Sequence, residues 1–334
     1  MDSRFRGNDC PLQRPCPAND TSTEGPRTYC DGKQTLCSAW QKKNQSLVAL
    51  NHLAELQCQK QYLALQSIPV PQPPRPKLGQ HFLRDRRFQR RIVDSLPIQS
   101  HDLVCEIGPG RGAMTELLAA RAQQVVAIEV DRDLARMLQQ KFSNKPGIEV
   151  LEADILLTDL ATLCRRYQRE QCFVFGSLPY YITSPILHHL LDFAGSIHGM
   201  GVVVQREVAD RLSAQPGSRP YGYLTVLTQL GTNPRIEFGI PPGAFSPPPK
   251  VDSALVTFQM KPERMRLPAE ERKALLEFLK LCFAHKRKNL LNNLAPVYAR
   301  QRVETELAAL KLPPTIRAEQ LALEQFEKLL ARLR

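Results

Sequence analysis

The chain has 334 residues, of which 43% are hydrophobic, and it carries a formal net charge of +12. That length and apolar content suffice for one large and one small domain plus a tail. The nine cysteines include no C-x-x-C pair, which argues against a zinc site or a disulfide framework, and we expect no metal. No apolar run of about 18 residues and no signal-peptide core is present, so we expect a cytoplasmic protein without a membrane span.

Residues 1–74 differ in composition from the rest of the chain. They are rich in Pro, Gln, Ser, Thr and Asn, hold five of the nine cysteines, and end in a Pro-dense run over 69–76. Such a run is typical of an extended linker. Leucines within 34–66 are spaced for a helix. We expect a disordered extension or a misassigned start, and the alternative is an arm that binds RNA or a partner.

A buried-strand pattern over 103–107 opens the next region and runs directly into a glycine-rich turn, followed by a helical pattern over 113–121. The turn contains three alternating glycines, Gly108, Gly110 and Gly112. Glycines let a backbone approach a ligand closely. This spacing is not the G-x-G-x-x-G of a dinucleotide pyrophosphate site, which makes NAD the weaker interpretation.

Three further apolar strands end in polar residues. The strand at 125–129 ends in Glu129, about 20 residues beyond the glycine turn. An acid that binds ribose hydroxyls in a nucleotide-binding fold is expected at this distance. The strand at 149–154 ends in Asp154, which is placed to accept from an adenine amino group or simply to cap a helix. The ends of these strands, together with the end of the strand at 172–175, fit an S-adenosylmethionine pocket better than the alternatives.

The segment Ser177-Leu178-Pro179-Tyr180 follows the strand at 172–175. A short polar side chain, a turn fixed by Pro and an aromatic ring at a strand end can bind a planar base by its amino group. This pattern suggests methylation of an amino group, although Pro and Ser are also common in ordinary strand-to-helix turns.

Strands and helices continue to alternate beyond this segment. This pattern implies an α/β fold with a mostly parallel, Rossmann-like sheet covered by helices on both faces. From residue 268 onward the pattern is purely helical, so a small all-helical domain follows a boundary near Lys261-Pro262. The elements that we expect before that boundary are helices 185–193, 207–214 and 221–230 and strands 201–205, 235–238 and 254–258.

From about Arg75 to the C-terminus, the chain resembles the ribosomal RNA small-subunit adenine dimethyltransferase family. Six motifs carry the resemblance, in the family's order: Leu78-Gly79-Gln80-His81-Phe82-Leu83, Glu106-Ile107-Gly108-Pro109-Gly110, Ile128-Glu129-Val130-Asp131, Ser177-Leu178-Pro179-Tyr180, Phe245-Ser246-Pro247-Pro248-Pro249-Lys250-Val251-Asp252-Ser253 and Arg287-Lys288-Asn289-Leu290-Leu291-Asn292-Asn293-Leu294.

The resemblance implies a class I methyltransferase domain at 75–261 that uses S-adenosyl-L-methionine, and a helical RNA-binding domain at 262–334. It further implies dimethylation of two neighbouring adenines near the end of small-subunit ribosomal RNA, on the immature small subunit, by a monomer. His81 and Ser177 stand where the family usually has Asn. The implied cofactor-binding residues are His81, Leu83, Gly108, Glu129, Asp154 and Ser177.

We assign the chemistry to the Ser177 segment and to Phe245. Acceptors at Ser177 Oγ and the Leu178 carbonyl would hold the two hydrogens of the adenine amine and favour the positive charge that develops on its nitrogen. Tyr180 would stack on one face of the base after the Pro179 turn, and Phe245 on the other. The alternative is that both rings are core aromatics. No general base is evident.

The positive charge flanks the sheet domain. Residues 73–100 hold seven basic and two acidic residues, and residues 261–334 hold sixteen and nine. Such flanks suit a surface that follows RNA phosphates, and a solvated face is the alternative. The run His285 to Lys288, with Leu290, Leu291 and Leu294 after it, predicts a helix with a basic start, while the other flank carries Arg84, Arg86, Arg87, Arg90 and Arg91.

Two other functions stay open at this level. A large-subunit ribosomal RNA adenine methyltransferase of the antibiotic-resistance type would share every pocket motif. A non-catalytic assembly or transcription factor would keep the fold and the RNA surface, with the chemistry lost at Ser177.

Overall fold

A computed structural model describes residues 81–179, 182–261 and 268–334. The predictions for residues 1–80, for Tyr180 and for residues 262–267 lie outside the described residues. All of the described residues belong to one compact unit.

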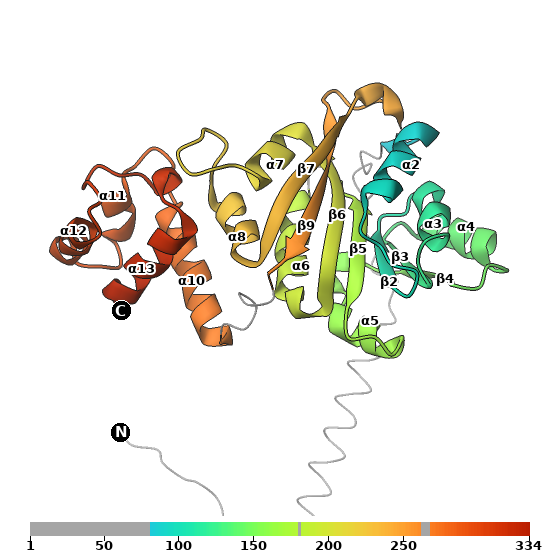
Figure 1. The fold of residues 1–334 in the computed structure, drawn as a ribbon, viewed down its shortest axis with the longest axis horizontal. Coiled ribbons are helices and arrows are strands. Elements are labelled where there is room, and N and C mark those ends of the chain that lie inside the picture. The colour runs from blue at the N-terminus through green and yellow to red at the C-terminus, as the bar shows by residue number, and fades with distance from the viewer. Residues whose placement is uncertain (1–80, 180–181, 262–267) are drawn as a thin grey trace, which may run out of the picture. The chain divides into compact units, whose positions relative to one another are not determined.

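A seven-stranded sheet forms the centre of this unit, in the order β4-β3-β2-β5-β6-β9-β7 (Figure 1). The first five strands in that order run parallel, whereas β9 is antiparallel to both β6 and β7. The predicted mostly parallel sheet is therefore confirmed. The strands are β2 (Leu103–Ile107), β3 (Gln124–Glu129), β4 (Ile148–Glu152), β5 (Cys172–Ser177), β6 (Ile197–Gln205), β7 (Thr232–Ile240) and β9 (Ser253–Met260).

Helices cover both faces of the sheet. In β2, Val104 packs into the cluster that includes residues of α2 and α3, whereas Cys105 packs into the cluster on the other face. This alternation follows from the two-residue period of a strand and explains why a strand buried on both sides reads as a continuous apolar run. One face carries α2 (Arg86–Ser95), α3 (Ala113–Ala119) and α4 (Arg132–Phe142), and the other α5 (Leu160–Arg166), α6 (Thr183–Asp192) and α7 (Arg206–Leu212) (Figure 1).

The predicted elements are present with shifted ends. The strand expected at 201–205 begins earlier, at Ile197, and the strand expected at 235–238 extends over all of β7. A second, two-stranded sheet was not predicted: β1 (Phe82–Leu83) pairs antiparallel with β8 (Phe245–Ser246). Cys105, Cys164, Cys172 and Cys282 are buried free thiols, as expected of core cysteines.

The C-terminal part is helical, as predicted. Its apolar cluster includes Phe278, Leu307 and Phe326, together with Val226 and Leu230 of α8. Because α8 shares this cluster, the domain boundary near Lys261 stays a prediction. No helix within the described residues is long and apolar enough to cross a membrane. The helices are α8 (Tyr223–Gly231), α10 (Ala269–Cys282), α11 (Leu290–Leu294), α12 (Arg300–Ala309) and α13 (Leu323–Leu333).

Candidate active site

The predicted cofactor residues gather at one edge of the sheet. Strands β4, β3, β2 and β5 are parallel neighbours, so their carboxyl ends lie side by side. Gly108 and Asp154 follow the ends of β2 and β4, and Glu129 and Ser177 are the last residues of β3 and β5. A Cβ atom added at Gly108 would lie 3.8 Å from the Ser177 carbonyl oxygen. The structure therefore brings together residues that are distant in the sequence.

The glycine turn adopts a backbone that other residues rarely take. Gly108, Gly110 and Gly112 have φ values of 66°, 58° and 75°, in the left-handed region. A Cβ at Gly110 would come within 2.8 Å of the Phe82 ring, and one at Gly112 within 2.7 Å of Leu138. At Gly108 the Ser177 carbonyl is the only near atom among the described residues, so a ligand can approach the backbone there.

Glu129 holds the glycine turn in place. Its Oε2 accepts from the Gly110 N–H at 3.2 Å and its Oε1 from the Asp131 N–H at 3.0 Å. Burial raises the pKa of this carboxyl, and the two backbone donors counteract part of that rise. Each carboxylate oxygen has a second lone pair that can accept from a hydroxyl. A ribose-binding role is thus compatible with the structural one, and it stays a prediction.

The residues after β4 and β5 are fixed by local hydrogen bonds. Asp154 Oδ1 accepts from the Leu156 N–H at 2.9 Å and caps the short 3₁₀ helix Ile155–Leu157, as the structural alternative for this residue predicted. The Leu178 N–H donates to the Val203 carbonyl of β6 at 3.0 Å. The Pro179 carbonyl accepts from the Thr183 hydroxyl at 3.0 Å. These bonds position the half-buried Ser177 at the strand end.

The segment that contains His81 and Leu83 meets the segment that contains Phe245 in the two-stranded β1–β8 sheet. Leu83 pairs with Phe245, and His81 Nδ1 lies 2.8 Å from the Pro247 carbonyl oxygen. The Gln89 side chain, which is buried, donates to the Leu83 carbonyl at 2.7 Å. This pairing holds the segment of His81 and Leu83 beside the glycine turn, where Phe82 lies against Gly110.

Phe245 is 5% exposed and belongs to the same apolar cluster as Leu83. In this structure its ring is a core aromatic, as the alternative interpretation had it. Stacking on a target base would require the base to reach a nearly covered ring, so that role stays a prediction.

Glu106 is a residue to which the sequence reasoning gave no role. It is 2% exposed, and its Oε2 has no hydrogen-bond partner in the described residues. Burial raises the pKa of its carboxyl to about 7. The signal was present in the sequence, because a lone acid interrupts the apolar run of β2.

The two basic flanks differ in their structure. On α2, Arg86 and Arg90 are exposed, Arg87 pairs with Asp85 at 2.9 Å, and Arg91 lies 4.0 Å from the centre of the Phe238 ring. The predicted helix is present over Leu290–Leu294, with its leucines buried, but the prediction that it starts at the basic residues from His285 is wrong. Asn289 caps α11 by accepting from the Asn292 N–H, so the basic residues 285–288 lie in the turn before the helix, where all four are exposed.

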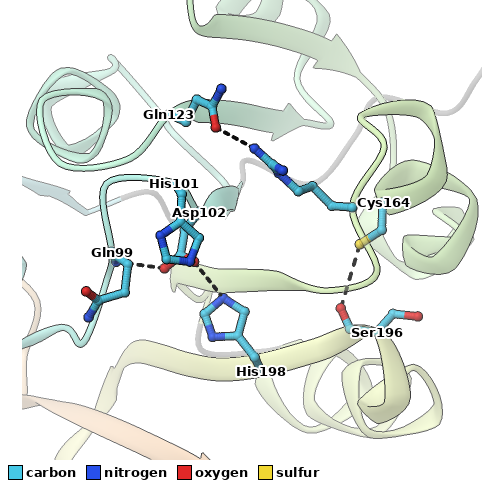
Figure 2. Close-up of polar contacts among 8 residues, drawn as sticks. Gln99, His101, Asp102, Gln123, Cys164, Ser196 and His198 are labelled. Carbon is cyan, nitrogen blue, oxygen red and sulfur yellow. Dashed lines mark hydrogen bonds and ion pairs between the residues drawn. The ribbon is translucent and has the colours of Figure 1, made fainter.

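A separate polar cluster lies where β2 and β6 begin (Figure 2). The predicted cofactor residues stand at the carboxyl ends of the parallel strands, hence at the opposite edge of the sheet. Asp102, which precedes β2, accepts from the Gln99 N–H at 2.7 Å. Its other carboxylate oxygen lies 3.4 Å from Nε2 of His198 on β6 and 3.8 Å from Nε2 of the exposed His101. These contacts link the starts of two strands that are separated by β5, which indicates a structural role.

Comparisons with known proteins agree with this architecture. Residues 73–334 match the family described as "Ribosomal RNA adenine dimethylase". The chain is 41% identical to the "Ribosomal RNA small subunit methyltransferase A" of Koribacter versatilis, over 77% of this chain and 94% of that protein. It is 43% identical to the protein of the same name from Acidobacterium capsulatum, over 76% and 89%.

Two solved structures resemble the described unit. The 23S rRNA methyltransferase ErmE matches with a TM-score of 0.60 and 32% identity, over 75% of this chain and 99% of that one. A dimethyladenosine transferase from Plasmodium falciparum matches with a TM-score of 0.61 and 23% identity, over 75% and 96%, and supports the fold alone.

Proposed function

Because the chain belongs to the ribosomal RNA adenine dimethylase family, we propose that it methylates the exocyclic amines of two adjacent adenines near the 3′ end of small-subunit ribosomal RNA. The observation that carries this proposal is the 41–43% identity to proteins named as small-subunit methyltransferases, over most of their length. Identity to the large-subunit enzyme ErmE is 32%. The small subunit is therefore the favoured substrate.

S-adenosyl-L-methionine is the cofactor that the strand ends fit. Within the part of the chain that the structure describes, a Cβ added at Gly108 would meet only the Ser177 carbonyl, at 3.8 Å. Acceptors for ribose hydroxyls and for an adenine amino group stand at Glu129 and Asp154. His81 and Leu83, held by the β1–β8 pairing, would border the methionine part. When bound, this cofactor supplies an electrophilic methyl group.

The chain's own residues then have to orient the target amine. Ser177 Oγ and the Leu178 carbonyl would accept the two amine hydrogens, which turns the nitrogen lone pair toward the methyl group and favours the positive charge developing on nitrogen. The hydrogen bond from the Leu178 N–H to Val203 supports this geometry by fixing the backbone beside Ser177. Tyr180 would stack on the extruded base. The excess proton leaves to water, so no general base is needed.

RNA would be held by the two basic flanks. Arg86 and Arg90 on α2 and the exposed turn 285–288 present side chains suited to phosphates. We propose that the chain acts as a monomer on the immature small subunit in the cytoplasm.

Methyl transfer from labelled S-adenosylmethionine tests the proposal, with immature small subunits and large-subunit RNA offered in parallel. We expect label on two adjacent adenines of small-subunit RNA and none on the large-subunit RNA. Label on large-subunit RNA would establish the resistance-type activity instead. Binding of small subunits without any label would establish the non-catalytic assembly role.

A further inference from the structure

Glu106 is a buried acid with an incomplete set of hydrogen bonds. All five residues of β2 are buried, and Glu106 is 2% exposed. Its place in the strand puts its side chain on the same face as Val104, which packs with residues of α3. Its Oε2 accepts no hydrogen bond from the described residues. Buried carboxyl groups are ordinarily paired or hydrogen-bonded, so this one calls for an explanation.

The neighbours of Glu106 supply no positive charge. Its partners across the sheet are Ala127 on β3 and Phe175 on β5, both apolar. From α3 it faces Thr115, whose buried hydroxyl lowers the pKa of Glu106, although neither this hydroxyl nor Glu106 Oε2 forms a hydrogen bond of good geometry within the described residues. Within the described residues, no lysine, arginine or histidine is paired with Glu106.

Among the described residues, the charged group that faces Glu106 is another carboxylate. Glu129 lies two residues beyond Ala127 on β3, hence on the same face of the sheet, and its charge raises the pKa of Glu106 further. On the opposite face, the Cys105 thiol keeps its proton because burial raises its pKa. On α3, the exposed Glu116 is engaged by Lys141 at 3.1 Å.

Two acids so placed cannot both be ionised at low cost. Glu129 has two backbone N–H donors and is the better anion. Glu106 has none on Oε2, and burial brings its pKa to about 7. In the protein without cofactor, part of the Glu106 population therefore carries a proton at neutral pH.

The position of Glu106 relates this proton to the cofactor site. Glu106 lies two residues before Gly108, on the strand that leads into the turn that Glu129 holds through Gly110. S-adenosylmethionine carries a sulfonium and an ammonium group against one carboxylate, so it is a net cation. A cation that binds at this turn favours the ionised form of a nearby carboxyl.

We propose that Glu106 is the proton-exchanging counter-charge of the cofactor site: it is protonated in part in the free enzyme and passes that proton to solvent when the cationic cofactor binds. This inference rests on the proposed function, because it takes S-adenosylmethionine as the ligand. The only bond that breaks is the carboxyl O–H, and buffer accepts the proton.

Calorimetry of S-adenosylmethionine binding in buffers of different ionisation enthalpy measures this proton directly. With a pKa of about 7, we expect release of about half a proton at pH 7, falling to about a tenth at pH 8. Glu106→Gln keeps the size of the side chain and removes the titration. It should abolish this release and bind S-adenosylmethionine on the order of 10-fold more weakly.

His81→Asn is the control, because it changes another predicted cofactor residue and leaves the Glu106 carboxyl in place. It should still release the proton. Binding by the starting protein without proton release, or equal release by Glu106→Gln, would overturn the inference. In the starting protein, an increase in proton release from pH 7 to pH 8 would also overturn the inference. Absence of all S-adenosylmethionine binding would instead overturn the proposed function, and this assignment with it.

Discussion

Ser177 is the residue on which the proposed chemistry depends most. If its hydroxyl accepts from the target amine, Ser177→Ala should leave cofactor and RNA affinity nearly unchanged. Turnover should fall about 10- to 100-fold, which equals roughly 1.4–2.7 kcal/mol of transition-state stabilisation. Ser177→Asn restores the residue usual in the family and should methylate at least as fast as the starting protein. Single-turnover assays on immature small subunits measure both, and equal rates for serine and alanine would limit Ser177 to a role in backbone geometry.

A second prediction at this scale concerns Glu106 and the unfolding free energy of the protein without cofactor. Its pKa is about 7 in the folded protein and 4.5 as an unperturbed side chain, so the folded state retains a proton that the unfolded state loses between these values. The stabilisation is complete below pH 4.5 and is lost as the pH rises through 7. Relative to Glu106→Gln, the starting protein should lose about 1–3 kcal/mol of unfolding free energy between pH 5 and pH 8. Urea denaturation of both proteins at the two pH values measures this, and a difference that does not change with pH would contradict it.

At the scale of elements, the close packing of the glycine turn can be tested separately from the backbone strain that any side chain would add there. Gly110→Ala introduces a positive-φ alanine and a Cβ only 2.8 Å from the Phe82 ring. Gly217→Ala is the matched control, because Gly217 also has positive φ but no atom of another described residue within 4 Å of an added Cβ. Both should lose about 1–3 kcal/mol from strain.

Only Gly110→Ala should lose more than that and also weaken S-adenosylmethionine binding, since the Glu129 contact moves with the turn. Adding Phe82→Ala should restore part of this extra loss. Equal losses for the two glycines, measured by thermal unfolding, would show that the Phe82 contact is not tight.

Much of the sheet was predictable, because apolar runs mark buried strands and their polar ends mark one edge. The residues Gly108, Glu129, Asp154 and Ser177 meet there because the strands that carry them are parallel neighbours. The β1–β8 pair was not predictable, since two-residue strands have no period to detect and join segments more than 160 residues apart. The turn at 285–288 was misread as helix because basic residues are also common in helices, and only Asn289, as a cap, marked the true start.

At the scale of the whole molecule, positive charge is concentrated at the flanks of the sheet domain. Residues 101–260 hold fourteen basic and sixteen acidic residues, so the net charge of +12 comes from the rest of the chain. The described part of the C-terminal flank presents its exposed turn at 285–288, next to the apolar cluster that includes α8. An even distribution of charge would attract RNA without preferred contacts. Charge concentrated at the flanks instead allows particular residues to contact phosphates.

Replacing Arg287 and Lys288 together by alanine distinguishes these two cases. If both contact phosphates, RNA binding should weaken, and the slope of log affinity against log salt should fall by about one unit per lost contact. The control is Arg136→Ala with Lys145→Ala, which removes the same charge from exposed positions on and after α4. That helix packs near β4, at the end of the sheet opposite β7. Binding isotherms at several salt concentrations should leave the control slope nearly unchanged. Equal slopes for the two double variants would mean that residues 287 and 288 act only through net charge, as a solvated face.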